Sequence, residues 1–293
     1  MSGGGGARPD LLEAIVAATR CGVAERTTKP SRPQLERAAA ARAPQGRAFV
    51  EALRRPDRYN VIAECKRRSP SRGVIREVYR PEEIAVGYVA AGAAAVSVLT
   101  EPAFFDGALA HLAAVRARVS LPLLQKDFIL SEHQLLEGRA SGADAVLLIV
   151  AALDDETLRG LARAARGLDL AVLTEVHDRR ELDRALDAGA DVIGVNNRNL
   201  RTLAVDLTAS RELIVTIPED VVAVAESGLR TGSDLAALRE TGYDAFLIGE
   251  SLMRRPSPGG ALATLLDEAG APEHGIRRAV ARVEELASQN ATK

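Results

Sequence analysis

The chain contains no tryptophan, and aromatic residues make up only 3% of its 293 residues. It has two cysteines, Cys21 and Cys65, which are too few for a disulfide framework and do not form a metal-ligand pattern. This argues against a small disulfide-rich secreted protein, so we expect a cytoplasmic location. The four histidines are scattered, and we expect them at the surface or at helix ends rather than in a metal site.

Long apolar runs and an excess of one charge are also missing. No stretch approaches 18 apolar residues, and the apolar run 11–18 is interrupted by Glu13. We therefore expect neither a membrane span nor a signal peptide. The net charge of -2 gives no electrostatic argument for binding nucleic acid. With 47% hydrophobic and 27% charged residues, the composition is typical of a globular protein with a sizeable core.

An internal repeat organises the sequence. A helix-ending glycine leads into an apolar strand in the segments 91–96, 141–146, 188–193 and 241–246. Strands are predicted at 61–66, 94–100, 121–126, 144–150, 169–175, 191–196, 221–226 and 244–249. Eight apolar strands, each followed by an amphipathic stretch, predict an α/β fold, namely a (β/α)8 TIM barrel with an N-terminal helical extension. A doubly wound open sheet is the alternative, but the first turn lacks the G-x-G-x-x-G pattern usual in that fold.

Helix starts are marked by residues that can cap them. Asp178 and Glu181 have the spacing of a capping box, while Asp154 and Ser233 can serve as simple N-caps. The alternation of strand and helix is therefore specified locally as well as by the repeat.

The predicted barrel spans 59–270 and has a segment on either side. Residues 1–9 are rich in glycine, and we expect disorder there. Residues 10–58 are predicted to form the helical extension, with a break near Pro44. Residues 271–293 are predicted to form a helical tail, to which we assign no function.

Charged or amide residues stand where apolar strands should end, namely Glu64, Lys66, Lys126, Glu175, Asn196 and Glu226. A buried strand has no structural use for charge at its end, so their recurrence indicates one shared polar pocket. In a barrel, the loops at the C-terminal ends of the strands build such a site. The strand period places Glu64 and Lys66 on one face. The structural alternatives are a solvated pair for Glu64 and Lys66, and a lysine that snorkels from a strand end for Lys126.

Two further pairs near strand ends can contact a substrate. Asn196 and Arg198 share parity after the sixth strand, although they could instead fix a loop by hydrogen bonding. Phe105 and Phe128 could belong to the core, but their neighbours at the predicted barrel mouth favour an aromatic substrate surface.

The last two βα loops are suited to binding phosphate. Ser227, Gly228 and Gly249 follow the seventh and eighth strands, where glycine lets backbone N–H groups approach an anion. A tight turn would explain one glycine equally well, so the pair is the stronger signal. The hydroxyl of Ser69, after the first strand, could complete the clamp.

A series of motifs in order covers nearly all of residues 10–268. They are IAECKRRSPS at 62–71, LTEP at 99–102, KDF at 126–128, LLIV at 147–150, TEVH at 174–177, GVNNRNL at 194–200, AESG at 225–228 and LIG at 247–249. On these motifs the chain resembles indole-3-glycerol phosphate synthase. The resemblance implies a lyase of tryptophan biosynthesis that converts 1-(2-carboxyphenylamino)-1-deoxyribulose 5-phosphate to indole-3-glycerol phosphate. It also implies release of carbon dioxide and water, with no metal or organic cofactor.

The resemblance further implies a role for each candidate. Lys126 would be the general acid of ring closure, assisted by Glu175, while Glu64 and Lys66 would serve the dehydration. Asn196 belongs to this catalytic group and, with Arg198, would hold the anthranilate carboxylate. The remaining residues would flank the aromatic ring, meet the ribulose hydroxyls or hold the phosphate; they are Phe105 and Phe128, then Glu226 and Ser227, then Ser69, Gly228 and Gly249.

The expected partner is therefore a phosphorylated small molecule, with no nucleic acid and no membrane. We expect a monomer, and contacts with other tryptophan-pathway enzymes stay open. Two other functions remain: a Schiff-base-forming aldolase or synthase that uses Lys126 or Lys66, and a catalytically silent phospho-sugar binding subunit. Glu250 departs from the expected pattern, because its charge lies beside Gly249 and would have to point away from the phosphate.

Overall fold

The computed structural model describes residues 10–27 and 30–271 of the chain. The predicted disorder of residues 1–9 and the helical tail predicted beyond residue 271 lie outside the described residues. No helix in the described ranges is long and apolar enough to cross a membrane.

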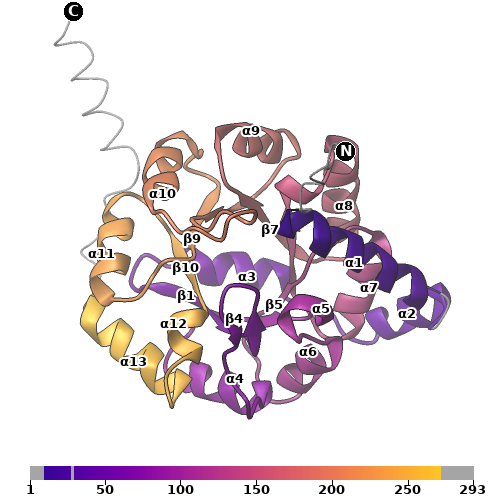
Figure 1. Cartoon of the computed structure of the whole chain (residues 1–293), viewed down its shortest axis with the longest axis horizontal. Helices are drawn as coiled ribbons and strands as arrows, with labels where there is room; N and C mark the ends of the chain where they lie inside the picture. Colours follow the sequence, from indigo (N-terminus) through magenta and orange to yellow (C-terminus); the bar gives the residue numbers. More distant parts are fainter. Residues whose placement is uncertain (1–9, 28–29, 272–293) are drawn as a thin grey trace, which may run out of the picture.

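Eight parallel strands close into a barrel (Figure 1). They are β1 (Asn60–Cys65), β4 (Ala95–Leu99), β5 (Leu123–Lys126), β6 (Ala145–Ile149), β7 (Ala171–Val176), β8 (Val192–Asn196), β9 (Val222–Glu226) and β10 (Ala245–Ile248). Neighbouring strands in the sequence pair with each other, and β1 completes the ring by pairing with both β4 and β10. The predicted (β/α)8 barrel is therefore confirmed.

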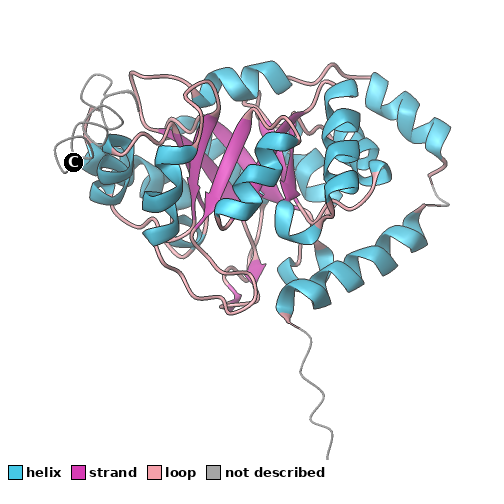
Figure 2. Cartoon of the chain, turned by 90° about the horizontal axis from the view of Figure 1, so that it is seen from above, coloured by secondary structure: helices cyan, strands magenta, loops and turns pink. Residues whose placement is uncertain are grey.

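Helices surround the barrel and also precede it (Figures 1 and 2). Those before β1 are α1 (Leu11–Arg26), α2 (Arg32–Ala40) and α3 (Gly46–Leu53). Those that follow strands are α4 (Pro81–Ala90), α6 (Leu109–Arg116), α7 (Glu132–Ala140), α8 (Asp155–Gly167), α9 (Arg179–Asp187), α10 (Thr208–Leu213), α11 (Gly232–Glu240) and α13 (Pro258–Ala269). Shorter elements in the loops are α5 (Pro102–Phe105), η1 (Val150–Ala152), η2 (Ile214–Thr216), α12 (Glu250–Met253) and the hairpin of β2 (Arg68–Ser69) and β3 (Gly73–Val74).

The alternation of side chains along each strand divides the core into two layers. In β1, Ile62 points into the barrel, where it belongs to an inner cluster with residues of the other strands. Val61 and Ala63 point outward into the larger cluster between the barrel and its helices. Cys65 also points outward, as its parity predicts, and its Sγ lies 3.7 Å from the carbonyl oxygen of Pro81 at the start of α4. The strand ends therefore present alternate residues to the barrel mouth.

The N-terminal helices cover both ends of the barrel. Phe49 and Leu53 of α3 are fully buried in the inner cluster and close the end at which the strands begin. Helix α1 lies at the opposite end, where Leu11 and Ile15 line the cavity described below. Nε of Arg26, the last residue of α1, donates to Oε1 of Glu137 in α7 at 3.0 Å. These contacts fix α1 beside the carboxyl ends of the strands.

Candidate active site

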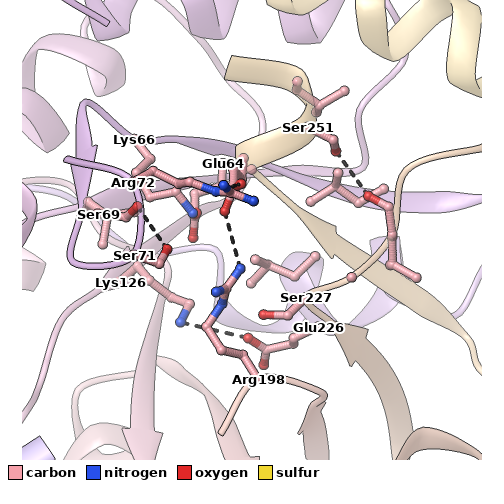
Figure 3. Close-up of a pocket in the computed structure, with 18 of the residues that line it drawn as sticks. Glu64, Lys66, Ser69, Ser71, Arg72, Lys126, Arg198, Glu226, Ser227 and Ser251 are labelled. Carbon is pink, nitrogen blue, oxygen red and sulfur yellow. Dashed lines mark hydrogen bonds and ion pairs between the residues drawn. The ribbon is translucent and has the colours of Figure 1, made fainter. Parts of the chain in front are cut away.

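A cavity of about 1390 Å³ opens at the C-terminal ends of the barrel strands. The predicted site residues all line it; they are Glu64, Lys66, Ser69, Phe105, Lys126, Phe128, Glu175, Asn196, Arg198, Glu226, Ser227, Gly228 and Gly249. The barrel thus brings together residues that are up to 185 positions apart, since the first is 64 and the last is 249. Figure 3 shows side chains of both halves of the chain around this space.

Lys126 ends β5 and lies between two carboxyl groups. Its Nζ donates to Oε2 of Glu175 at 3.2 Å and lies 3.7 Å from Oε2 of Glu226 (Figure 3 draws the second contact). Burial alone would lower the pKa of Lys126, but neighbouring carboxylates, of which Glu175 has the largest effect, outweigh it and raise the pKa above its ordinary value. Lys126 therefore carries a proton at neutral pH and holds it inside the cavity.

The two carboxyl groups beside Lys126 differ in charge. Burial opposes ionisation of Glu175, but the charges of Lys126 and His177 outweigh burial and lower its pKa. Burial and the charge of Glu175 together raise the pKa of Glu226 to about 8, against the attraction of Lys126. At neutral pH the site thus contains an ionised carboxylate and a protonated carboxyl group, which is the division of charge that acid and base catalysis require.

Glu64 and Lys66 face the cavity from the end of β1. Nζ of Lys66 donates to Oε1 of Glu64 at 2.6 Å, and their side chains are 15% and 4% exposed. This burial contradicts the alternative of a solvated surface pair.

Two glycines make room for the carboxyl groups of Glu64 and Glu226. A Cβ at Gly249 would lie 2.3 Å from Oε1 of Glu64, and a Cβ at Gly194 would lie 2.0 Å from Oε1 of Glu226. Only glycine therefore fits at either position without a shift of the carboxylate. Gly194 was not among the predicted residues, although a glycine within the apolar strand 191–196 is a signal of close approach.

Arg198 lies at the edge of the cavity and already has an anionic partner. Its Nη2 donates to Oε2 of Glu250 at 3.2 Å, while Nε of Arg72 donates to Oε1 of the same carboxylate at 2.9 Å. Glu250 lines the cavity, and its carboxylate is paired with these two arginines, which balance its charge; that it points away from a bound phosphate stays a prediction. Oδ1 of Asn196 accepts from the backbone N–H of Arg198 at 3.0 Å, so Asn196 fixes this loop.

Hydroxyl groups and residues with positive φ also line the cavity. Oγ of Ser69 lies 3.3 Å from Oγ of Ser71, which also lines the cavity and was not predicted (Figure 3). Ser227 and Gly228 both have positive φ, at 65° and 86°. Positive φ is uncommon for serine, and such conformations cluster at ligand sites. These residues offer the cavity hydroxyl groups and backbone suited to contact with an anion.

The predicted aromatic surface is present at the mouth. The ring centroids of Phe105 and Phe128 are 6.4 Å apart, and the rings are tilted by 35°. Phe105 belongs to the short helix α5, whose start is fixed by Glu101: the carboxylate accepts from the backbone N–H groups of residues 103–105. Glu101 is the third residue of the LTEP motif and was not singled out from the sequence, although a carboxylate one residue before a proline is a typical helix start.

His177 was expected at the surface or at a helix end, and it does stand directly before Asp178, the N-cap of α9; its place beside Glu175 was not predicted. Its ring is partly buried beside Glu175, with Nε2 3.7 Å from Oε1 of that residue. Its Nδ1 lies 3.0 Å from Oε2 of Glu181. The shared parity of Glu175 and His177 was the available signal, because residues two apart in a strand face the same side.

Comparison with known proteins identifies the family. The family model for indole-3-glycerol phosphate synthase matches residues 12–265. The chain belongs to the indole-3-glycerol phosphate synthase family. It is 47% identical over 259 residues to the indole-3-glycerol phosphate synthase of Acidithiobacillus ferrooxidans, covering 87% of this chain and 98% of the relative. It is 46% identical over 267 residues to that of Streptomyces griseus, covering 90% and 98%.

A solved structure supports the fold of this indole-3-glycerol phosphate synthase family member. Thiamine phosphate pyrophosphorylase from Pyrococcus furiosus superposes with a TM-score of 0.54 at 17% identity, over 70% of this chain and 93% of that chain. At this identity the likeness concerns the fold alone.

Proposed function

We propose that the protein is an enzyme of tryptophan biosynthesis, a carboxy-lyase that converts 1-(2-carboxyphenylamino)-1-deoxyribulose 5-phosphate to indole-3-glycerol phosphate, carbon dioxide and water. The observation that carries this proposal is the position of Lys126. A buried, protonated amine lies between an ionised Glu175 and a protonated Glu226, inside a cavity that Ser69, Gly228 and Gly249 also line. Ring closure on a ketose needs such a proton donor at the carbonyl oxygen.

In the first step, the ring carbon that bears the carboxylate bonds to the ketose carbonyl carbon. Lys126 gives its proton to the carbonyl oxygen as that oxygen gains charge, and Glu175 keeps the lysine oriented and stabilises it before transfer. Loss of carbon dioxide then returns the bonding electrons to the ring. In this account the carboxylate leaves from a position held by Arg198.

The second half removes the new hydroxyl group as water. One group must protonate the leaving hydroxyl, and another must take the proton whose loss restores aromaticity. Nζ of Lys66 and Oε1 of Glu64 are 2.6 Å apart at the cavity wall. These two residues can supply the acid and the base of this step. Glu226 and Ser227 contact the ribulose hydroxyls in this proposal.

The phosphate occupies the corner formed by Ser69, Gly228 and Gly249. Ser69 offers a hydroxyl, and Gly228 and Gly249, which also line the cavity, offer the backbone N–H groups for the anion. The rings of Phe105 and Phe128 then flank the anthranilate ring. The cavity, at about 1390 Å³, is large enough to hold a ligand of this size.

We also propose that the enzyme acts as a cytoplasmic monomer on a phosphorylated small molecule. The proposed site is built within one chain, and both cysteines are free. Among the residues that the structure describes, no group of three or more histidine, cysteine, aspartate or glutamate side chains is placed to hold a metal ion.

The test is turnover of the purified protein with this substrate in EDTA, followed by indole fluorescence. Metal-independent turnover, with one carbon dioxide released for each indole formed, supports the proposal. Saturable binding without turnover would instead support a silent phospho-sugar binding protein. A Schiff-base enzyme would give a borohydride-trapped adduct on Lys126 or Lys66. The raised pKa of Lys126 argues against that chemistry, which requires a neutral amine.

A further inference from the structure

The two carboxylate oxygens of Glu175 face different partners. Oε2 accepts from Lys126, whereas Oε1 lies 3.7 Å from Nε2 of His177. Within the described part of the chain, neither Oε1 of Glu175 nor Nε2 of His177 has a hydrogen-bond partner. The side chain of Glu175 is only 1% exposed, and a buried polar atom without a partner is costly. The two atoms therefore form a pair that a small movement would close.

Glu181 fixes the ring of His177 from its other side. Oε2 of Glu181 lies 3.0 Å from Nδ1 and also accepts the backbone N–H of His177 at 2.8 Å. Glu181 is itself in the first turn of α9, where Asp178 caps the helix. Since each ring nitrogen faces a carboxylate, both nitrogens must carry hydrogen for both contacts to be favourable, which makes the ring an imidazolium.

The charges around this ring favour the imidazolium. Burial lowers the pKa of His177, but the hydrogen bond to Glu181 and the charge of Glu175 outweigh it and raise the pKa. The other charged groups that face it are Glu226 of β9 and, around a second cavity of about 390 Å³, Asp178, Arg180, Arg184 and Arg201. Two of these arginines are neutralised by partners of their own, Arg184 by Asp155 and Arg201 by Asp10, each at 2.6 Å.

We propose that His177, clamped by Glu181, is a positioning residue that holds Glu175 ionised and aimed at Lys126. This inference rests on the function proposed above. Lys126 supplies one cation to Glu175, and His177 supplies the second from the opposite oxygen. With both cations in place, the Glu175 carboxylate does not rotate toward the substrate. It also does not take up the proton that Lys126 gives to the substrate. Removal of His177 leaves Oε1 without a neighbouring cation, so that Glu175 keeps only Lys126 and its side-chain hydrogen bond to Asn196 and is protonated more easily.

The activity test compares His177→Gln with a matched control, His133→Gln. His133 also faces a glutamate four residues on, with Nε2 3.6 Å from Oε1 of Glu137, but Glu137, unlike Glu175, does not line the site cavity. In His177→Gln we expect kcat to fall about tenfold with KM nearly unchanged. The midpoint of the acid limb of the kcat/KM profile should shift upward by roughly one pH unit, because Glu175 loses a neighbouring cation and its pKa rises. The control should keep the wild-type profile. A His177→Gln profile that superposes on the wild type would overturn the proposal.

A second measurement needs neither substrate nor turnover. Nitrogen-15 NMR of the ring gives the titration midpoint of His177 in the wild type, in Glu181→Gln and in Glu175→Gln. We expect a midpoint above the ordinary value of 6.5 in the wild type and a lower one in each variant. A midpoint that neither variant moves would refute the clamp. If the titrations are coupled but the wild type has no activity on the ketose substrate, the proposed function fails while the ion pair stands.

Discussion

Oε1 of Glu226 lies directly over Gly194, in the space that a side chain at position 194 would fill. The two residues belong to the paired strands β8 and β9. Because Gly194 has no side chain, the buried carboxyl group of Glu226 on the neighbouring strand can occupy this space. This relationship ties a strand residue with no chemistry of its own to the charge arrangement around Lys126.

Gly194→Ala should therefore disturb the site indirectly, through Glu226. The new methyl group would force the carboxyl of Glu226 away from Lys126, and overpacking of this kind costs about 1–3 kcal/mol. We expect a lower melting temperature and a kcat reduced by about tenfold or more. Gly160→Ala is the matched control, because no atom lies within 4 Å of the added Cβ and alanine favours a helix. Equal effects of the two substitutions would contradict the steric account.

The substitution Glu226→Gln should alter how stability depends on pH. The folded-state pKa of about 8 is above the ordinary 4.5, so this carboxyl group favours folding in its protonated form. The wild type should lose that contribution as pH rises from 4.5 to 8, while glutamine should not.

We therefore expect the melting temperature of Glu226→Gln, relative to that of the wild type, to increase between pH 5 and pH 8. The increase should be roughly 2–4 °C for each kcal/mol of stability that the wild type loses. The exposed Glu219 provides the control, since Glu219→Gln should keep a constant difference. If the difference in melting temperature between Glu226→Gln and the wild type stayed constant over the same interval, burial would not raise the pKa of Glu226.

Arg198→Ala should mainly weaken substrate binding. If Arg198 exchanges Glu250 for the ring carboxylate, its loss should raise KM by about tenfold and change kcat much less. A competitive analogue without the ring carboxylate should bind the variant and the wild type equally well. Arg179→Ala, which removes an exposed arginine paired with Asp183, is the control. An unchanged KM would refute the carboxylate assignment.

The fold and most of the site follow from local patterns. Each strand carries its own apolar run and parity, so Glu64 and Lys66 could be placed on one face before any partner was known. The barrel then puts all strand ends in one place, which is why residues as distant as Ser69 and Gly249 could be assigned to one pocket.

What the sequence could not provide are contacts between loops. Glu250 is met by Arg72 and Arg198 from two other loops, and no local pattern records that balance of charge. At α11 the prediction failed over two residues: Ser233 was expected to cap the helix, but Thr231 does. Thr231 and Asp234 bond to each other's backbone N–H groups, whereas Ser233 has an alanine three residues on and can form no such pair.

The central claim is that Lys126 supplies the proton for ring closure, and the most direct measurement is kcat of Lys126→Ala at saturating substrate. The account predicts a loss of about 10²-fold or more, with substrate still bound and the melting temperature still that of a folded barrel. If the variant kept a tenth of wild-type kcat or more, Lys126 could not be the acid, and the proton would have to come from another group of the cavity.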